Sequence, residues 1–303
     1  MTINLKTYQK LGNLLLLNIA LLCFAAIDVK AQLNPLNSQY FLNQYQANPA
    51  YAGSTDGLNV NLNYRKQWSN IPGSPSTQSI TADYKMDKVG LGINVFNEKA
   101  GSLQRTKAVA TYAYHLPLNN ESQKLNFGAS IGILNERVDY SGVNGDLSDL
   151  SLSAFNDKGS QFDGDFGIAY TSTKLNIEAA IPNIRSFIKQ NDDNNVDRSR
   201  FYAAASYKIN TGLGITALEI EPKVAFRDIQ GYKSIFDAGA NFNFASKLFI
   251  MGMYHSTKSA SFGAGMNYKS SLAIMGFYTT ETSALQGTAN GTFEISLRAT
   301  LFK

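Results

Sequence analysis

The sequence is poor in the residues that most often build metal sites, disulfides and nucleophilic centres. Its 303 residues include one cysteine, Cys23, and two histidines, His115 and His255. Because Cys23 lies in an N-terminal segment that we expect to be removed, the mature chain would have no disulfide, thiolate metal site or cysteine nucleophile. Neither histidine has a partner at metal-ligand spacing, so we interpret both as structural residues of strands and expect no metal.

Charge and long apolar runs are also scarce. Asp, Glu, Lys and Arg make up 17% of the chain, and the formal net charge is +4. No stretch clusters Lys and Arg beside aromatic residues on one face, so the sequence lacks the basic patch of a nucleic-acid site. After residue 31, no segment approaches the ~18 continuous apolar residues of a spanning helix, which excludes a helical membrane protein. The sequence contains no phosphate-binding glycine loop followed by a helix and no H-E-x-x-H, so we predict no enzyme, no catalytic residue and no cofactor.

The N-terminus has the pattern of a secretory signal peptide. Lys6 and Lys10 precede the apolar run Leu11–Ile27, and Val29-Lys30-Ala31 is typical of a cleavage site. We therefore expect a signal peptide over residues 1–31 and a mature chain that starts near Gln32. The alternatives are an uncleaved membrane anchor and a lipoprotein signal at Cys23.

Strict alternation of apolar and polar residues dominates the chain after residue 57. In the first such segment, one face has Leu58, Val60, Leu62 and Tyr64, and the other has Asn59, Asn61, Asn63 and Arg65. Successive side chains of a strand point to opposite faces, so this period of two predicts a strand with one apolar and one polar face.

About fourteen segments follow this pattern, and most have the length that a tilted strand needs to cross a bilayer. Short turns alternate with long loops, aromatic residues gather near segment ends, and the polar faces hold mainly Asn, Ser, Thr, Gly and Ala. We predict an all-β fold, a transmembrane antiparallel up-and-down β-barrel with short periplasmic turns, longer outer loops and both chain ends on the periplasmic side. The alternative is a soluble β-sandwich. The expected strands are Leu58–Gln67, Gln78–Met86, Val89–Phe96, Lys107–His115, Leu125–Leu134, Phe162–Tyr170, Leu175–Ile181, Phe201–Ile209, Leu218–Phe226, Phe236–Phe244, Leu248–His255, Phe262–Tyr268, Leu272–Tyr278 and Phe293–Leu301.

Several polar or small residues admit a functional and a structural interpretation. Asp163 and Asp165 share one face of a strand and could act as a paired acid and base, but we favour unpaired charges on a watery lumen wall. Pro222 makes the middle of its strand doubtful. Glycines at strand spacing are interpreted as relief of crowding in a curved sheet; they are Gly90, Gly92, Gly128 and Gly132.

The two longest loops are expected at Asp139–Ser160 and Pro182–Ser199, facing outward and able to hold a partner. The second contains Asp193-x-Asn195-x-Asp197, which resembles the start of a calcium loop. However, Arg198 occupies the glycine position and no acidic residue stands at the twelfth position, so we favour a solvated loop.

The segment before the strands, residues 32–57, has no regular period and suggests an extended stretch or a short helix. It contains Ser38-Gln39-Tyr40 and then Asn48-Pro49-Ala50-Tyr51-Ala52-Gly53. The first strand and its loop add Tyr64-Arg65-Lys66-Gln67-Trp68 and Gly73-x-Pro75-x-Thr77. This run resembles the opening of the PorP/SprF family, outer-membrane proteins of the type IX secretion system in Bacteroidetes. Lys66 departs from the Asn expected in many relatives.

The resemblance implies a non-enzymatic protein of the cell outer membrane, a monomeric barrel within a larger complex. Family members assist the export or surface anchoring of large cargo, such as adhesins, with a C-terminal sorting domain. Some serve gliding motility, and others are implied to attach to a periplasmic protein linked to peptidoglycan. The expected partners are outer-membrane lipid, periplasmic secretion components and secreted cargo, with no nucleic acid.

These inferences divide the chain into a signal peptide at 1–31, a periplasmic pre-barrel segment at 32–57 and an outer-membrane barrel at 58–303. We expect Asn48–Gly53 to lie at the periplasmic mouth, where the segment plugs the barrel, docks a partner or caps the lower rim. Two other functions stay open: a passive outer-membrane channel or porin, and a secreted all-β binding module.

Overall fold

The computed structural model describes residues 39–118, 122–140, 150–188, 199–212, 217–230, 233–269, 271–282, 287 and 289–302. The chain divides into two compact units, Met1–Lys30, of which no residue is among these, and Ala31–Lys303. The expected signal peptide, Ser38 and the calcium-like stretch at 193–198 thus lie outside the described residues. Within them, no helix is both long and apolar enough to cross a membrane.

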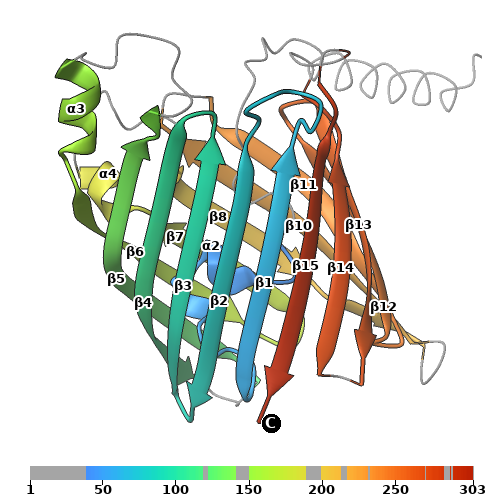
Figure 1. Ribbon diagram of the computed structural model, residues 1–303. Coiled ribbons are helices and arrows are strands. Elements are labelled where there is room, and N and C mark those ends of the chain that lie inside the picture. Colours follow the sequence, from blue (N-terminus) through green and yellow to red (C-terminus); the bar gives the residue numbers. More distant parts are fainter. Residues whose placement is uncertain are drawn as a thin grey trace, which may run out of the picture. The chain divides into compact units, whose positions relative to one another are not determined.

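The second unit is one antiparallel sheet closed into a cylinder (Figure 1). Strands that follow one another in the chain pair side by side, and β15 pairs with β1. Because β8 and β9 both pair with β10 and are separated by Lys208 alone, they form one wall strand, and the predicted 14-strand barrel is confirmed. The strands are β1 (Leu58–Gln67), β2 (Ser76–Met86), β3 (Val89–Ala100), β4 (Leu103–Pro117), β5 (Lys124–Val138), β6 (Ser160–Thr171), β7 (Leu175–Ile181), β8 (Ser199–Tyr207), β9 (Ile209–Thr211), β10 (Leu218–Ile229), β11 (Ile235–Phe244), β12 (Leu248–His255), β13 (Ser259–Tyr268), β14 (Leu272–Thr279) and β15 (Thr292–Leu301).

The two ends of the cylinder differ in the length of their connections. One end carries the segments 68–75, 139–159, 182–198 and 280–291, whereas the connections at the other end span at most six residues. Outer-membrane barrels carry their longer loops outside the cell, so we call these the outer end and the inner end. The last strand finishes at the inner end, where Leu301 pairs with Leu58.

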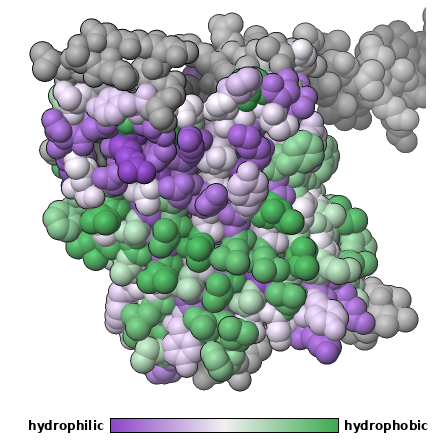
Figure 2. Space-filling view, viewed as in Figure 1, coloured by the Kyte–Doolittle hydropathy of each residue, from purple (hydrophilic) through white to green (hydrophobic). Residues whose placement is uncertain are grey.

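The wall has the predicted alternation of apolar and polar faces. On β1, Leu62 and Tyr64 are 41% and 45% exposed, whereas Asn61 and Arg65 are buried on the lumen side. Figure 2 shows the result on the outer surface, a hydrophobic belt with hydrophilic residues between it and the outer end. A belt of this kind is the surface that such a barrel presents to lipid.

The wall between β3 and β4 is taller than we predicted. Residues 97–103, expected to be a loop, continue the two strands, and the chain turns only at Gly101-Ser102, where Gly101 has a φ of +59°. The local polarity of this stretch is the reason for the error, because residues such as Asn97 and Lys99 lie beyond the hydrophobic belt while still pairing within the sheet.

Pro222 does not interrupt β10, contrary to our doubt. It lies opposite Ala240 of β11 in a continuous ladder. On the other side, β10 pairs with β9 up to Ile220 and with β8 from Lys223 onward. Pro222 therefore sits between these two ladders, where the missing N–H breaks no pairing.

One part of the lumen wall is apolar, which differs from the polar interior that we expected. On β12 and β14, inward side chains from Phe249, Met251, Met275 and Phe277 form a buried cluster. Phe41 and Leu42, which precede the strands, pack against this cluster. These strands are thus apolar on both faces because lipid covers one and the N-terminal segment covers the other.

Four short helices complete the described residues. The α-helix α2 (Gln44–Ala47) and the 3-10 helix η1 (Pro49–Tyr51) belong to the segment before β1, and α2 is visible within the cylinder in Figure 1. Helices α3 (Leu150–Asn156) and α4 (Ile184–Ile188) belong to the two long outer connections. The prediction of a short helix before the barrel is confirmed.

Candidate functional site

Residues 39–53, here called the plug, run through the lumen from its outer half to the inner rim. Gln39 donates hydrogen bonds to Glu294 and Ser296, near the outer end of β15. Asn43 donates to Thr81, in the middle of β2. At the inner end, the Gly53 amide donates to Asp83 over 3.0 Å. The plug therefore occupies much of the length of the lumen, and Asn48–Gly53, which we expected at the periplasmic mouth, is its inner part.

The outer half of the plug is fixed by a buried cluster of charged groups. The Tyr40 hydroxyl donates to Asp237 over 2.7 Å, and Asp237 also pairs with Arg227 and His255 at 2.8 Å and 2.6 Å. The Tyr40 carbonyl accepts a hydrogen bond from Lys223. Burial raises the pKa of the Tyr40 phenol well above its ordinary value. The hydroxyl therefore remains a donor across the physiological pH range.

The inner half of the plug is the Asn48–Gly53 motif. The Asn48 side chain, fully buried, caps η1 by accepting from the Ala50 amide over 3.0 Å. Its amide nitrogen donates to Glu178 and to the carbonyls of β6 and β7 at 3.3 Å. His115 donates from Nε2 to the Ala52 carbonyl, so this histidine of the wall also holds the plug.

The wall accommodates the plug by means of glycines that lack a side chain at the points of contact. A Cβ added at Gly90 would lie closer than 3.0 Å to the Ala52 carbonyl, and one at Gly128 equally close to the backbone of Pro49 and Ala50. Gly92 faces the Tyr45 hydroxyl in the same way. We interpreted these glycines as relief within a curved sheet; the structure shows that they make room for the plug. Gly132 alone of the four meets only a neighbouring strand.

The second part of the family motif builds the outer end of the first hairpin. The Gln67 amide donates to the Pro75 carbonyl, and the side chain of Arg65 contacts Thr77 at 3.3 Å. Trp68 and Gly73 have positive φ angles of 45° and 73° in the connecting turn, whereas Tyr64 faces lipid. The two parts of the motif meet at Glu294, which accepts a hydrogen bond from the Gln39 side chain and is the cross-strand neighbour of Arg65.

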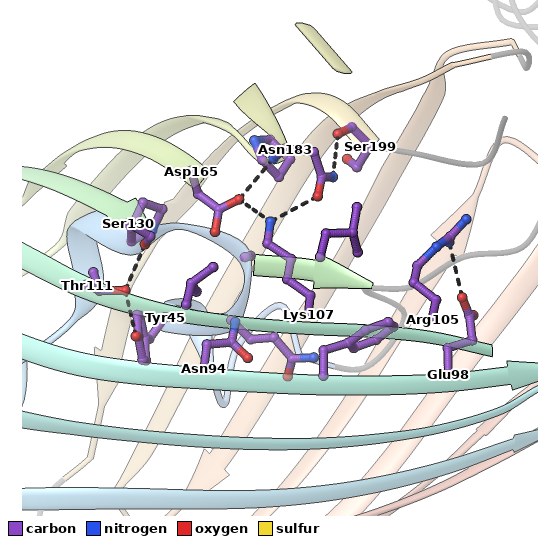
Figure 3. A pocket seen from close by; sticks show the side chains of 17 residues that line it. Tyr45, Asn94, Glu98, Arg105, Lys107, Thr111, Ser130, Asp165, Asn183 and Ser199 are labelled. Atoms are coloured by element: carbon purple, nitrogen blue, oxygen red, sulfur yellow. Dashed lines mark hydrogen bonds and ion pairs between the residues drawn. The ribbon is translucent and has the colours of Figure 1, made fainter. Parts of the chain in front are cut away.

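Between the plug and the wall lies a cavity of about 130 Å³. It extends from the hydrogen-bonded group of Tyr45, Thr111 and Ser130 in mid-lumen to Glu98 and Arg105 near the outer end (Figure 3). Three inward apolar side chains of the wall, Phe96, Val109 and Leu134, contribute to its lining. A hollow with mixed polar and apolar lining is the ordinary form of a ligand site.

The charged groups of this cavity are paired with one another. Lys107 lies 2.6 Å from Asp165 and 3.5 Å from Asp163, and it contacts the Asn183 side chain. Both aspartates face the lumen as predicted, but our expectation of unpaired charges was wrong. Arg105 pairs with Glu98 and Glu136 in the same way. Alternation identifies such residues as inward-facing, but the partner of each lies on another strand and is invisible to a local pattern.

Chemically, the arrangement offers hydrogen bonds, ion pairs and apolar packing. Among the described residues, no group of three or more His, Cys, Asp and Glu side chains could hold a metal ion. Sequence reasoning missed most residues that hold the plug, among them Lys223, Arg227 and Asp237. Their only signal is a charge at an inward position of a strand that crosses a membrane, which needs a partner when it is buried.

A closed antiparallel cylinder with a lipid-facing belt and a filled lumen defines a plugged outer-membrane β-barrel. Residues 29–299 match the family described as type IX secretion system membrane protein PorP/SprF. The chain therefore belongs to this family, and its place is the outer membrane.

Solved structures of outer-membrane proteins are similar to the chain at low sequence identity. The outer membrane protein Omp33 of Acinetobacter baumannii is 8% identical with a TM-score of 0.48, over 82% of this chain and 100% of that chain. A triple mutant of Rhodopseudomonas blastica porin is 9% identical with a TM-score of 0.36, over 80% of this chain and 98% of that chain. No curated protein matches the chain.

Proposed function

We propose that this protein is a closed barrel that assists type IX secretion by holding secreted cargo, such as a large adhesin, at its outer end. The observation that carries the proposal is the plug, whose backbone and side chains bond to the wall from β15 to β7. A lumen filled in this way supports a binding or anchoring role and argues against the passive porin that we considered. The outer-membrane location argues against the other alternative, a secreted all-β binding module.

The outer end is the side on which we place the cargo. It carries the connections 139–159 and 182–198, and on the face shown in Figure 2 most hydrophilic residues gather between the hydrophobic belt and this end. A polar surface above a lipid-facing belt stands in water, where a secreted polypeptide can reach it. This placement keeps the expected role of the two long loops in holding cargo.

For the periplasmic partners we propose a contact at the inner rim. Because Asn48 and Ala52 are fully buried against the wall, they cannot form a docking surface without leaving the lumen. Ser54, Thr55 and Asp56 are exposed and follow the plug directly at the inner end. They are the residues of the segment that a periplasmic secretion component would meet, and any link to gliding motility would pass through them.

A pull-down from detergent-solubilised outer membrane tests the proposal. An affinity-tagged full chain should recover type IX secretion components and a large surface protein, and the same preparation should not conduct ions in planar bilayers. A matched bait is the variant Asp56→Lys, which reverses one charge of the inner rim and removes the ion pair of Asp56 with Lys85 of β2. Loss of periplasmic components with retention of cargo would support the division of the two ends; steady conductance and no recovered component would favour the porin.

A further inference from the structure

The outer-half cavity has hydrogen-bonding atoms that nothing in the described part of the chain satisfies. Asn94 Oδ1 is inaccessible to solvent and has no hydrogen-bond partner there, and the same holds for Ser199 Oγ on a residue that is only 7% exposed. Both residues line the cavity, from opposite sides on β3 and at the start of β8 (Figure 3). A buried polar atom without a partner is unfavourable because it has lost its hydrogen bonds to water, so such atoms are commonly explained by a ligand or a bound water.

The rest of the lining limits the chemistry of that ligand. The charged lining residues, Glu98, Arg105, Lys107 and Asp165, balance in sign, and each forms an ion pair within the wall. A charged ligand would have to break one of these pairs, whereas a neutral one would not. The satisfied charges also leave few free groups for a sugar, which needs many hydrogen bonds.

The size of the cavity and the polarity of its lining both favour a ligand that consists of an apolar side chain attached to an amide. The cavity of about 130 Å³ is similar to the ~150 Å³ apolar cavity that holds benzene. Phe96, Val109 and Leu134 supply an apolar wall, and a peptide group supplies both the N–H for Asn94 and a polar partner for Ser199.

We infer that this cavity binds an apolar side chain, of the size of Leu or Phe, together with the adjacent peptide group of a polypeptide that enters from the outer end. The inference rests on the proposed function, since it names the chemistry by which cargo would be held. Buried side chains in such pockets are the usual anchors of a protein interface, while contacts around them exclude water.

Protection of a cysteine from a thiol reagent tests the inference directly. In the mature chain, Ser130→Cys would be the single thiol, at the floor of the cavity, and Ser54→Cys at the inner rim would be its control. The probes are N-acetylphenylalanine methylamide and N-acetylleucine methylamide, with N-acetylaspartate methylamide as the charged comparison. The neutral amides should slow the reaction of S130C with methyl methanethiosulfonate at least threefold, and should leave S54C unchanged.

In the S130C protein, Asn94→Ala should raise the concentration of neutral amide needed for half-maximal protection roughly three- to tenfold. This is the effect expected from the loss of one hydrogen bond. Absence of protection by both neutral amides, or equal protection by the aspartate amide, would overturn the inference. So would an S130C thiol that is unreactive in the free protein, because the chain's own outer segments would then fill the cavity.

A cellular comparison separates this inference from the proposed function. Val109→Trp fills the cavity, whereas Val224→Trp makes the same change on the lipid-facing side of β10. V109W should lower the recovered surface protein at least tenfold relative to V224W while both barrels fold; Val109→Phe serves if V109W does not fold. Equal recovery would overturn the inference alone, whereas no recovery with the wild type would overturn the proposed function and leave the amide result standing.

Discussion

The fit between the plug and the wall predicts a large effect from a single methyl group. Gly128 faces the lumen on β5, and a Cβ at this position would lie closer than 3.0 Å to Pro49 and Ala50. Normal separations between carbon atoms are about 3.5–4.0 Å. The variant Gly128→Ala can therefore form only if the plug backbone moves away from the wall, or if the wall opens.

The magnitude follows from the contacts that such a movement breaks. Moving η1 away from the wall breaks the Asn48 hydrogen bonds to the Ile168 and Ala179 carbonyls, at about 0.5–1.5 kcal/mol each. Overpacking a close-packed site adds about 1–3 kcal/mol. We therefore expect a loss of about 2–6 kcal/mol in the free energy of plug docking, a shift of roughly 30-fold or more toward the undocked state.

Planar-bilayer conductance is the assay, because the docked plug closes the lumen. The wild type should be silent, whereas G128A should show frequent openings and a lower thermal unfolding temperature in detergent. Gly276→Ala is the matched control: its Cβ would meet no atom within 4 Å, and it should behave as the wild type. If G128A folds, stays closed and unfolds at the wild-type temperature, the plug is not held as we describe.

Three further predictions concern single groups of the plug and the wall. Lys223→Met leaves the buried Glu178 carboxylate without its 2.8 Å partner and should cost about 3–5 kcal/mol in urea unfolding, because one member of a buried pair is lost. Burial raises the pKa of the phenols of Tyr40 and Tyr45. The contribution of these two neutral phenols to the free energy of unfolding should be complete below about pH 10 and should decline as the pH rises toward the folded-state pKa. Unfolding measured at several alkaline pH values should show this decline, and it should be less steep in Tyr45→Phe. Val224→Lys, on a lipid-facing residue that is 58% exposed, should cost about 2–4 kcal/mol in refolding into lipid vesicles, and a smaller loss would place it near an interface.

The wall could be predicted from the sequence because its signal is local. In β1, eight consecutive residues from Leu58 to Arg65 suffice to give the face of each side chain, and the pairing of neighbours in the chain does the rest. The plug could not be predicted in this way. Gln39 bonds to Ser296, 257 residues away in the sequence, and no periodic pattern records such a contact.

The apolar lumen of β12 and β14 had a signal that alternation alone could not interpret. Leu248–Met253 and Leu272–Met275 are continuous apolar runs, and a strand that is apolar on both faces needs cover on both. One cover is lipid, so the second has to come from within the barrel. Phe41 and Leu42 supply it, and the runs therefore predict an occupied lumen once the barrel is assumed.

The residues that carry the family resemblance now have a physical account. Gln39 and Asn48 bind the plug to the wall, Gly53 turns the chain at the inner rim with a φ of +67°, and Arg65 is the cross-strand neighbour of the residue that receives Gln39. These positions specify a closed lumen rather than a surface for partners. A chain that shares them should share the plug, and its choice of cargo should then depend on the outer loops and on the lining of the outer-half cavity. Exchanging those outer residues between two family members, with the plug left intact, should transfer cargo preference; transfer by the plug instead would contradict this division.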